Sequence, residues 1–251
     1  MKIELQQKAF KAFRGYVSLL NVIHEEATFL VSKEKISVLM MDPSHVAMID
    51  ASIKAEAFDS YEAEDGEKVS INIKELLRFL DRVDKKKDRV QIRNTRAKMI
   101  MTLKRHGSER RFEIPLLDSY DGDELPKPKI DFKVKVKLTG DALASAVKDV
   151  AIINHLITIK GDAHGFHISG EGDMGSSFSD WESGSEDILE LEVKEDGGSI
   201  YTMSYIQPII NQCKAIGDSI VLELSESMPV KISAVPKNTD LEAIFYLAPC
   251  L

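Results

Sequence analysis

An internal repeat with an offset of about 130 residues limits most strongly how this chain can fold. When the sequence is aligned with itself at that offset, apolar positions keep the same phase through both halves without a gap. The matched pairs include Val17 with Val147 and Ile114 with Ile244. Few matched positions are identical, so the repeat preserves a pattern of apolar residues. We therefore predict two copies of one domain.

A segment of different composition separates the two halves. Residues 118–129 read Asp-Ser-Tyr-Asp-Gly-Asp-Glu-Leu-Pro-Lys-Pro-Lys, and the two prolines and the glycine disfavour both a helix and a central strand. We predict an extended linker over residues 118–130, in which Leu125 is an apolar residue that needs a place to pack. The predicted domains are then residues 1–117 and residues 131–251.

Each half is expected to contain two amphipathic helices. From Lys8 to Leu20 the apolar residues recur at helical spacing, and a second helix opens at Asn72, an N-cap with a glutamate three residues later. The corresponding helices of the second half are predicted from Thr139 to Ile153, capped by Thr139, and from near Thr202. Pro208 falls within the last helix, which therefore either begins later or bends there.

Runs of β-branched and apolar residues between the helices predict antiparallel strands. In the first half they cover residues 28–31, 36–42, 45–52, 58–61, 68–71, 90–94, 98–104 and 110–116. In the second half they cover residues 156–160, 165–170, 175–181, 188–193, 219–225, 229–235 and 241–247. The predicted class is α+β: two duplicated, strand-rich domains, each with two amphipathic helices on one face.

The sequence offers little that predicts catalysis, a metal or a cofactor. His164 and His167, the one close pair of histidines, point to opposite faces of a strand. The glycines of residues 170–175 join two strands with no helix after them, which predicts a turn rather than a phosphate-binding loop. The acidic residues of the linker lack the spacing of a calcium loop. Nor does the spacing assemble a nucleophile with its base.

Other features predict a protein inside the cell. No apolar run approaches the roughly 18 residues that span a bilayer, and the amino terminus lacks the pattern of a signal peptide. Cys213 and Cys250 form neither a metal-ligand spacing nor a disulfide framework. We expect a protein that is not secreted and lies in the cytoplasm with the nucleoid of a prokaryote, or in the nucleus of a eukaryote.

The charge is distributed unevenly. The formal net charge of −8 argues against a polyanion partner, but the chain carries +4 up to Leu117 and −12 from Asp118 onward. The outer faces of the first two predicted helices are basic, with Lys8 and Lys11 in the first and Arg78 in the second. The position of the cations therefore matters more than their number.

Four segments taken in chain order resemble the proliferating cell nuclear antigen family of DNA sliding clamps. They are Met41-Asp-Pro-Ser-His-Val-Ala-Met48, the acidic Leu-Pro linker, Met228-Pro-Val230 and Phe245-Tyr-Leu-Ala-Pro249. The resemblance spans the whole chain. It implies a protein without catalytic activity or cofactor: three subunits close head to tail into a ring around duplex DNA, irrespective of its sequence. It also implies binding of a polymerase, a clamp loader, ligases and nucleases through short peptide motifs.

The resemblance assigns the basic helix faces to DNA. Three chains place twelve helices around the ring, and at a spacing of about 10 Å they leave a hole of about 28 Å, enough for a duplex and a layer of water. The residues expected to face phosphates are Lys8, Lys11, Arg14, Lys74, Arg78, Arg82, Lys148 and Lys214.

The resemblance also implies an apolar pocket for client peptides beside the linker. Its walls would be Met41, His45, Val46, Met48, Leu125, Pro126, Phe132, Met228, Pro229, Tyr246, Leu247, Ala248 and Pro249. Methionines suit a pocket that accepts several clients. Met48, where many relatives have leucine, and Cys250, where they often have lysine, depart from the family pattern.

Ring closure requires one strand from each half. The resemblance pairs residues 109–116 with residues 175–181 of the neighbouring subunit. The interface residues are Glu109, Arg110, Arg111, Phe112, Glu113, Ile114, Gly175, Ser176, Ser177, Phe178, Ser179, Asp180 and Trp181. Two points stay open. The ring consists either of identical chains or of paralogues. The alternative to a ring is a monomeric or dimeric protein-binding module that does not encircle DNA.

Overall fold

The computed structural model describes residues 1–118, 125–173, 175–236 and 240–250. Residues 119–124 of the predicted linker lie outside the described residues. The chain forms two compact units. One consists of Met1–Met41, Ile49–Leu125 and Asn238–Glu242, and the other of Asp42–Met48, Pro126–Lys237 and Ala243–Leu251. Asp42–Met48 therefore belongs to the unit formed mainly by the second half of the chain, and Asn238–Glu242 to the unit formed mainly by the first half, which the order of residues alone does not indicate. The domain boundaries predicted from the sequence stay a prediction.

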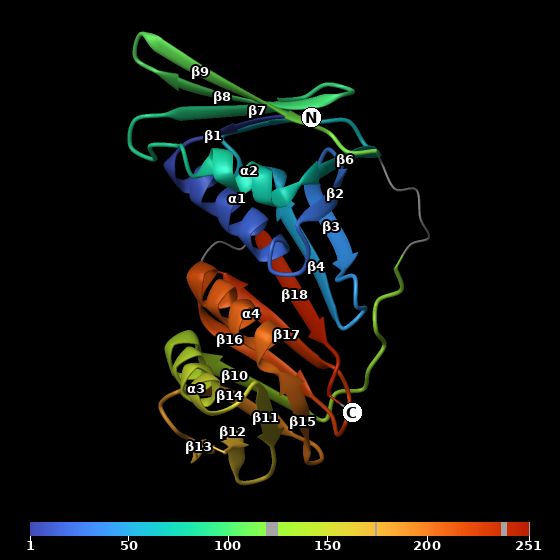
Figure 1. Cartoon of the computed structure of the whole chain (residues 1–251), viewed down its shortest axis with the longest axis vertical. Helices are drawn as coiled ribbons and strands as arrows, with labels where there is room; N and C mark the ends of the chain where they lie inside the picture. Colours follow the sequence, from blue (N-terminus) through green and yellow to red (C-terminus); the bar gives the residue numbers. More distant parts are fainter. Residues whose placement is uncertain (119–124, 174, 237–239, 251) are drawn as a thin grey trace. The chain divides into compact units, whose positions relative to one another are not determined.

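The described part of the first unit contains two helices and two groups of strands (Figure 1). The strand orders are β5-β1-β7-β8-β9 and β4-β3-β2-β6. The elements are β1 (Lys2–Leu5), α1 (Gln7–Leu20), β2 (Glu26–Val31), β3 (Lys35–Met41), β4 (Ala47–Lys54), the 3-10 turn η1 (Ala55–Ala57), β5 (Ser60–Glu62), β6 (Glu67–Asn72), α2 (Ile73–Leu80), β7 (Arg89–Asn94), β8 (Lys98–Arg105) and β9 (Ser108–Pro115).

The second unit repeats this arrangement. Its strand orders are β14-β10-β16-β17-β18 and β13-β12-β11-β15. The elements are β10 (Val134–Thr139), α3 (Gly140–Ile153), β11 (Leu156–Gly161), β12 (Gly165–Gly172), β13 (Gly175–Glu182), β14 (Ile188–Val193), β15 (Gly197–Thr202), α4 (Met203–Ile216), β16 (Gly217–Leu224), β17 (Val230–Pro236) and β18 (Leu241–Leu247). Each strand holds the position of the strand about 130 residues earlier, so the predicted duplication is confirmed.

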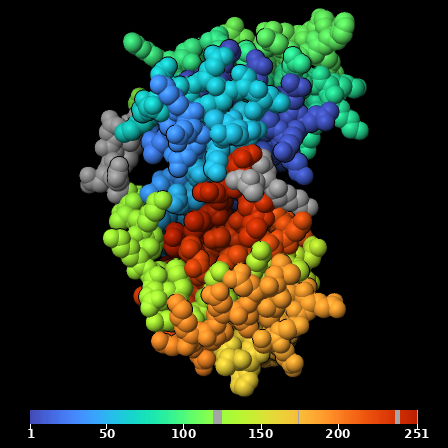
Figure 2. All heavy atoms as spheres, turned by 180° about the vertical axis from the view of Figure 1, so that it is seen from behind, coloured from blue at the N-terminus to red at the C-terminus, as the bar shows by residue number. Residues whose placement is uncertain are grey.

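The helices follow from the spacing of their apolar residues. In α1 the side chains of Phe10, Phe13 and Val17 are buried, whereas Lys8 and Lys11 are exposed. The two helices of each unit lie side by side on one face (Figure 1). Apolar side chains of each unit are buried, and the space-filling view shows the face opposite to that of Figure 1 (Figure 2). The predicted α+β class with paired helices is thus confirmed.

Helix boundaries agree with the predictions in both units, and only the capping of α3 differs. The Asn72 side chain accepts a hydrogen bond from the Glu75 N–H at 2.9 Å, so it caps α2 as expected. Thr139 precedes α3, but its hydroxyl donates to Asp187 at 2.8 Å instead of capping the helix. The helix with Pro208 begins at Met203, as predicted, and continues past the proline, which excludes the alternative of a later start.

Three strands were not predicted: β1, β10 and β15. The first is only four residues long, and the last begins with two glycines. No helix among the described residues has the length and apolar character that a membrane span requires.

Candidate functional site

The first candidate surface is the basic face of α1. Lys8 and Lys11 are exposed and Arg14 is half-exposed, and α1 contains no acidic residue. Within the described part of the chain, Lys8 and Lys11 have no carboxylate within ion-pair distance. Exposed lysines without a carboxylate partner have the character that nucleic-acid phosphates require.

Three other predicted cations of the first unit already have acidic partners. Arg14 donates to Asp81 Oδ1 from Nη2 at 2.7 Å and from Nε at 3.0 Å, which connects α1 to the residue after α2. The remaining two ion pairs are Lys74 with Glu25 and Arg78 with Glu75, both at 2.7 Å. Exposed ion pairs contribute about 0–1 kcal/mol, so a phosphate can compete for these cations.

The helices of the second unit carry less positive charge. Lys148 on α3 is exposed beside Asp149, and Lys214 on α4 pairs with Asp141 of α3. The hydrogen bond and charge of Lys214 lower the pKa of Asp141. Basic character therefore concentrates in the first unit, where Arg82 is also exposed.

The second candidate surface begins at the turn between β3 and β4. Asp42 is 3% exposed, and its carboxylate accepts hydrogen bonds from the N–H groups of Ser44, Val46 and Ala47 at 3.0, 2.8 and 2.6 Å. Burial opposes ionisation, but these donors and the Tyr205 hydroxyl hold the pKa of Asp42 below its ordinary value. Asp42 is therefore a buried carboxylate that fixes this turn.

That turn presents the residues expected to meet a client. His45 is exposed with a φ of 58°, and Val46 is half-exposed. The Ala248 N–H donates to the Val46 carbonyl at 2.9 Å, so the C-terminal segment of the second unit lies directly beside the turn. No sequence pattern indicated that Asp42 and Tyr205 hold this arrangement.

Exposed apolar side chains lie around the C-terminal segment. Met228 is 43% exposed, and the other described residues of this group that keep part of their surface are Phe132, Pro229, Tyr246, Ala248 and Pro249. Pro126 is exposed. Met48 and Leu247 are 3% and 0% exposed and belong to the core, beneath the surface rather than on it. Met41 and Leu125 belong to the first unit.

Two residues that the sequence analysis missed lie on the same surface. Lys231 is paired with Tyr246 in the register of β17 and β18, and its Nζ lies 5.9 Å from the centre of the Phe132 ring. Ile200 is 43% exposed and accepts a hydrogen bond from the Cys250 N–H at 2.8 Å. Only strand register and tertiary contacts reveal these neighbours, which lie far apart in the sequence.

The third candidate surface consists of two strand edges. Among the described strands, β9 ends one sheet and β13 ends another, and most of their side chains are exposed. Ile114 and Trp181 are the exceptions, at 2% and 9% exposed, so these two predicted interface residues face the core. Arg110 pairs with Asp88, and Arg111 pairs with Glu113.

Both edges also carry apolar groups. Phe178 on β13 is 60% exposed, and Ile152 on α3 is 77% exposed, in a helix that packs against β13. At the other edge, Phe112 of β9 and Phe79 of α2 are half-exposed, with ring centres 5.0 Å apart. Exposed apolar groups on a free strand edge favour a protein partner.

The described residues contain no group of three side chains able to hold a metal ion. His167 lies between two carboxylates, with Nδ1 2.6 Å from Asp180 and Nε2 3.4 Å from Asp162. Partial burial lowers the pKa of His167, but the two carboxylates outweigh it and raise that pKa above its ordinary value. Each ring nitrogen of His167 therefore has a carboxylate partner.

Comparisons with known proteins agree in both halves. The families described as "Proliferating cell nuclear antigen, N-terminal domain" and "Proliferating cell nuclear antigen, C-terminal domain" match residues 2–117 and 127–250. The chain is 30% identical to a DNA polymerase sliding clamp of Cenarchaeum symbiosum over 94% of this chain and 93% of that protein. It is 29% identical to one of Thermococcus onnurineus over 99% and 98%.

Two solved structures share the fold. Proliferating cell nuclear antigen from Thermococcus kodakaraensis gives a TM-score of 0.87 at 21% identity, covering 99% of both chains. A chain of the PCNA2–PCNA3 complex from Sulfolobus tokodaii gives a TM-score of 0.84 at 24% identity, again covering 99% of both chains.

Proposed function

This chain belongs to the proliferating cell nuclear antigen family, and we propose that it is a DNA sliding clamp that assembles as a trimeric ring around duplex DNA. In this role it holds a polymerase on its template and tethers a clamp loader, ligases and nucleases through peptide motifs. The function is one of binding, and we propose no catalytic step.

The observation that carries this proposal is that Lys8 and Lys11 on the basic face of α1 have no carboxylate partner among the described residues, in a chain with a net charge of −8. A net-acidic protein repels DNA over most of its surface, so contact is favourable only where cations gather. Contacts with phosphates are independent of sequence and weaken with salt, which allows the ring to slide. Lys8 and Lys11 have no ion pair to break before they contact a phosphate. In Arg14, Lys74 and Arg78 the phosphate replaces an exposed carboxylate as the partner of the cation.

Ring closure is proposed at the two exposed edges. The exposed Phe178 and Ile152 of one subunit would meet the aromatic pair Phe79 and Phe112 of the next, while β9 and β13 complete their backbone hydrogen bonds. Because the two edges differ, the contact is head to tail and generates a closed ring when the rotation fits.

The client site is proposed on the surface of the second unit. Tyr246, Pro229 and the exposed Met228 offer apolar contact area, and His45 and Lys231 offer polar contacts at its border. A peptide with apolar anchors binds such a surface by burying them. Met48 and Leu247 support this surface from below.

The mass of the purified chain tests the proposal first. Light scattering is expected to give three times the chain mass of 28.1 kDa, and the same sample is expected to increase the length of product made by a polymerase on primed circular DNA. A strict monomer that does not affect the polymerase contradicts the ring and favours the protein-binding module. A monomer that trimerises only when paralogous clamp chains are added indicates a ring of unlike subunits.

A further inference from the structure

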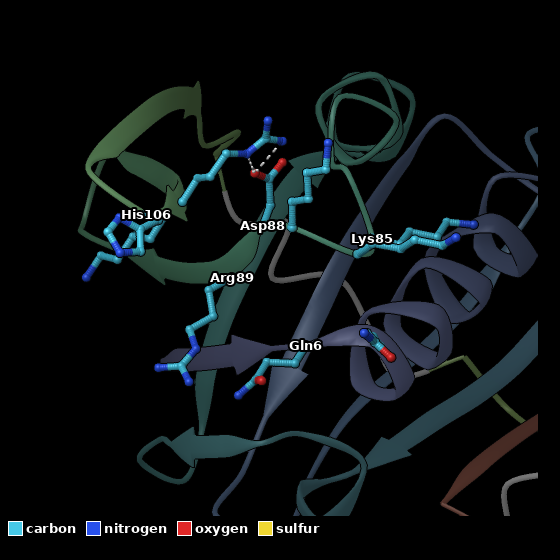
Figure 3. Close-up of a pocket in the computed structure, with 10 residues that line it drawn as sticks. Gln6, Lys85, Asp88, Arg89 and His106 are labelled. Atoms are coloured by element: carbon cyan, nitrogen blue, oxygen red, sulfur yellow. Dashed lines mark hydrogen bonds and ion pairs between the residues drawn. The ribbon is translucent and has the colours of Figure 1, made fainter.

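A hollow of about 430 Å³ in the first unit is lined mainly by basic side chains (Figure 3). It lies among the start of α1, the connection from α2 to β7 and the turn between β8 and β9. Six of its ten lining residues are lysine or arginine: Lys85, Lys86, Lys87, Arg89, Lys104 and Arg105. None of these is among the residues expected to face DNA.

The one acidic residue of the hollow does not neutralise these cations. The Asp88 side chain is 1% exposed and already forms ion pairs with Arg105 at 2.9 Å and with Arg110 at 2.8 Å. It also accepts a hydrogen bond from the Asp84 N–H at 2.9 Å. Burial opposes ionisation of Asp88, but these partners keep its pKa below the ordinary value. Asp88 therefore fixes Arg105 at the wall of the hollow.

Four cations of the hollow remain available. Within the described residues, Lys85, Lys86, Arg89 and Lys104 have no carboxylate within ion-pair distance, and Lys87 is 4.0 Å from Asp84. Figure 3 shows Lys85, Arg89 and His106 around the hollow, with Gln6 at its lower edge in this view. Unpaired cations in one concave site attract an anion strongly.

The hollow continues the basic face of α1. Gln7, the first residue of the helix, lines it, and Lys8 follows directly. The first turn of α1 has no acidic residue of its own, but the Asp59 carboxylate accepts a hydrogen bond from the Gln6 N–H at 2.6 Å. The positive charge of the hollow therefore comes from its lysine and arginine side chains. Lys8 and Lys11 are one helical turn apart, so the row of cations on α1 leads to the hollow.

We propose that this hollow binds the phosphodiester backbone of a nucleic-acid strand beyond the basic face of α1. The inference rests on the proposed clamp function, because the hollow is proposed to bind the same nucleic-acid strand that the basic face of α1 contacts. A nucleic-acid strand carries a phosphate about every 3.4 Å along the duplex axis, so a single strand supplies anions to both the helix row and the hollow. An acidic peptide has no such regular spacing of charge.

Titration of a fluorescein-labelled oligonucleotide of about 12 thymidines, followed by anisotropy over a series of salt concentrations, tests this site. The variant Lys86→Glu with Lys87→Glu is expected to bind about tenfold more weakly at low salt, and the slope of log K against log salt becomes shallower by about 0.7 for each lost phosphate contact. The control Lys33→Glu with Lys35→Glu makes the same charge change on exposed side chains outside the hollow and is expected to bind like the wild type. Should the first variant fold poorly by circular dichroism, Lys85→Gln with Lys86→Gln tests the same prediction.

Each outcome decides the inference. Unchanged affinity and slope in the hollow variants overturn it, and so does equal loss in the control. An oligoglutamate peptide that binds as tightly as the oligonucleotide, through the same lysines, overturns the nucleic-acid assignment and indicates an acidic protein partner. If only Lys8→Glu with Lys11→Glu weakens binding, the clamp function stands without the hollow. If the ring and processivity assays fail while oligonucleotide binding still depends on Lys86 and Lys87, the hollow stands without the clamp.

Discussion

The Tyr205 hydroxyl donates a hydrogen bond to Asp42 Oδ2 over 2.8 Å. It connects α4 to the turn that presents His45, and Asp42 uses its other oxygen to accept from two N–H groups of that turn. A buried carboxylate with this many donors holds its loop in one conformation. The exposed part of the proposed client surface therefore depends on two residues that a client does not touch.

Removing the hydroxyl is expected to loosen the turn. Tyr205→Phe loses one hydrogen bond to a charged acceptor, which lowers the free energy of unfolding by about 1–2 kcal/mol and weakens binding of a client peptide. Urea unfolding and peptide titration measure the two effects. The matched control for stability is Tyr246→Phe, because the Tyr246 hydroxyl makes no hydrogen bond among the described residues. Equal destabilisation in the two variants would contradict the role of the Asp42 contact.

Asp42 is also expected to make stability depend on pH. Its pKa is lower in the folded than in the unfolded protein, so its contribution is complete above the unfolded value and is lost as the pH falls through the folded value. Asp42→Asn is therefore expected to lower the melting temperature at neutral pH and to flatten the decline toward acid. Melting curves from about pH 7 to pH 3 measure this, and a variant that declines as steeply as the wild type would rule it out.

The basic face of α1 is expected to act on DNA and not on clients. Lys8→Glu with Lys11→Glu changes the charge by four units at two lysines that have no carboxylate partner among the described residues, and so lowers retention on circular DNA while client-peptide affinity stays the same. Retention after loading, measured at two salt concentrations, tests this. Lys148→Glu with Lys214→Glu makes the same charge change on the helices of the second unit, where Lys214 already pairs with Asp141, and its effect is expected to be smaller. Equal loss of DNA retention and peptide binding would show that the two surfaces have been misassigned.

The sequence was sufficient for features that depend on local pattern and not for those that depend on distant contacts. The α1 stripe and the Asn72 cap follow from residue spacing, so both were predictable. By contrast, the glycine-rich β15 does not have the composition of a strand. At Gly198 an added Cβ would collide with the Ile159 carbonyl of β11, so the glycine is required by close approach of the neighbouring strand.

The candidate sites show the same limit. The sequence shows that Arg14 and Lys74 are cations, but their partners Asp81 and Glu25 are 67 and 49 residues away. The hollow that includes Lys86 forms only when the α2–β7 connection meets the β8–β9 turn. Helical periodicity gives the exposed face of a helix, whereas the charge that a ligand meets there depends on the tertiary neighbours.

The client surface is expected to depend on its exposed apolar residues. Met228→Ala with Tyr246→Ala removes two partly exposed side chains from the second unit, so it is expected to weaken a client peptide at least about tenfold and leave the trimer intact. Peptide titration and light scattering measure the two properties. Leu189→Ala removes a side chain that is 53% exposed on β14 and is expected to leave the peptide affinity unchanged. Wild-type affinity in the double variant would move the client site elsewhere.

The exposed edge of β13 is expected to decide assembly. Phe178 is 60% exposed in the isolated chain, so Phe178→Glu buries no new charge in the monomer and leaves its melting temperature nearly unchanged. In a ring the same carboxylate would be placed against Phe79 and Phe112 of the neighbouring β9 edge, where Arg110 and Arg111 already pair with Asp88 and Glu113, and burying a charge there costs several kcal/mol. We therefore expect the variant to behave as a folded monomer by light scattering, while Leu189→Glu, which makes a similar change on an exposed residue of β14, still forms trimers. A Phe178→Glu protein that remains trimeric would show that subunits do not meet at this edge.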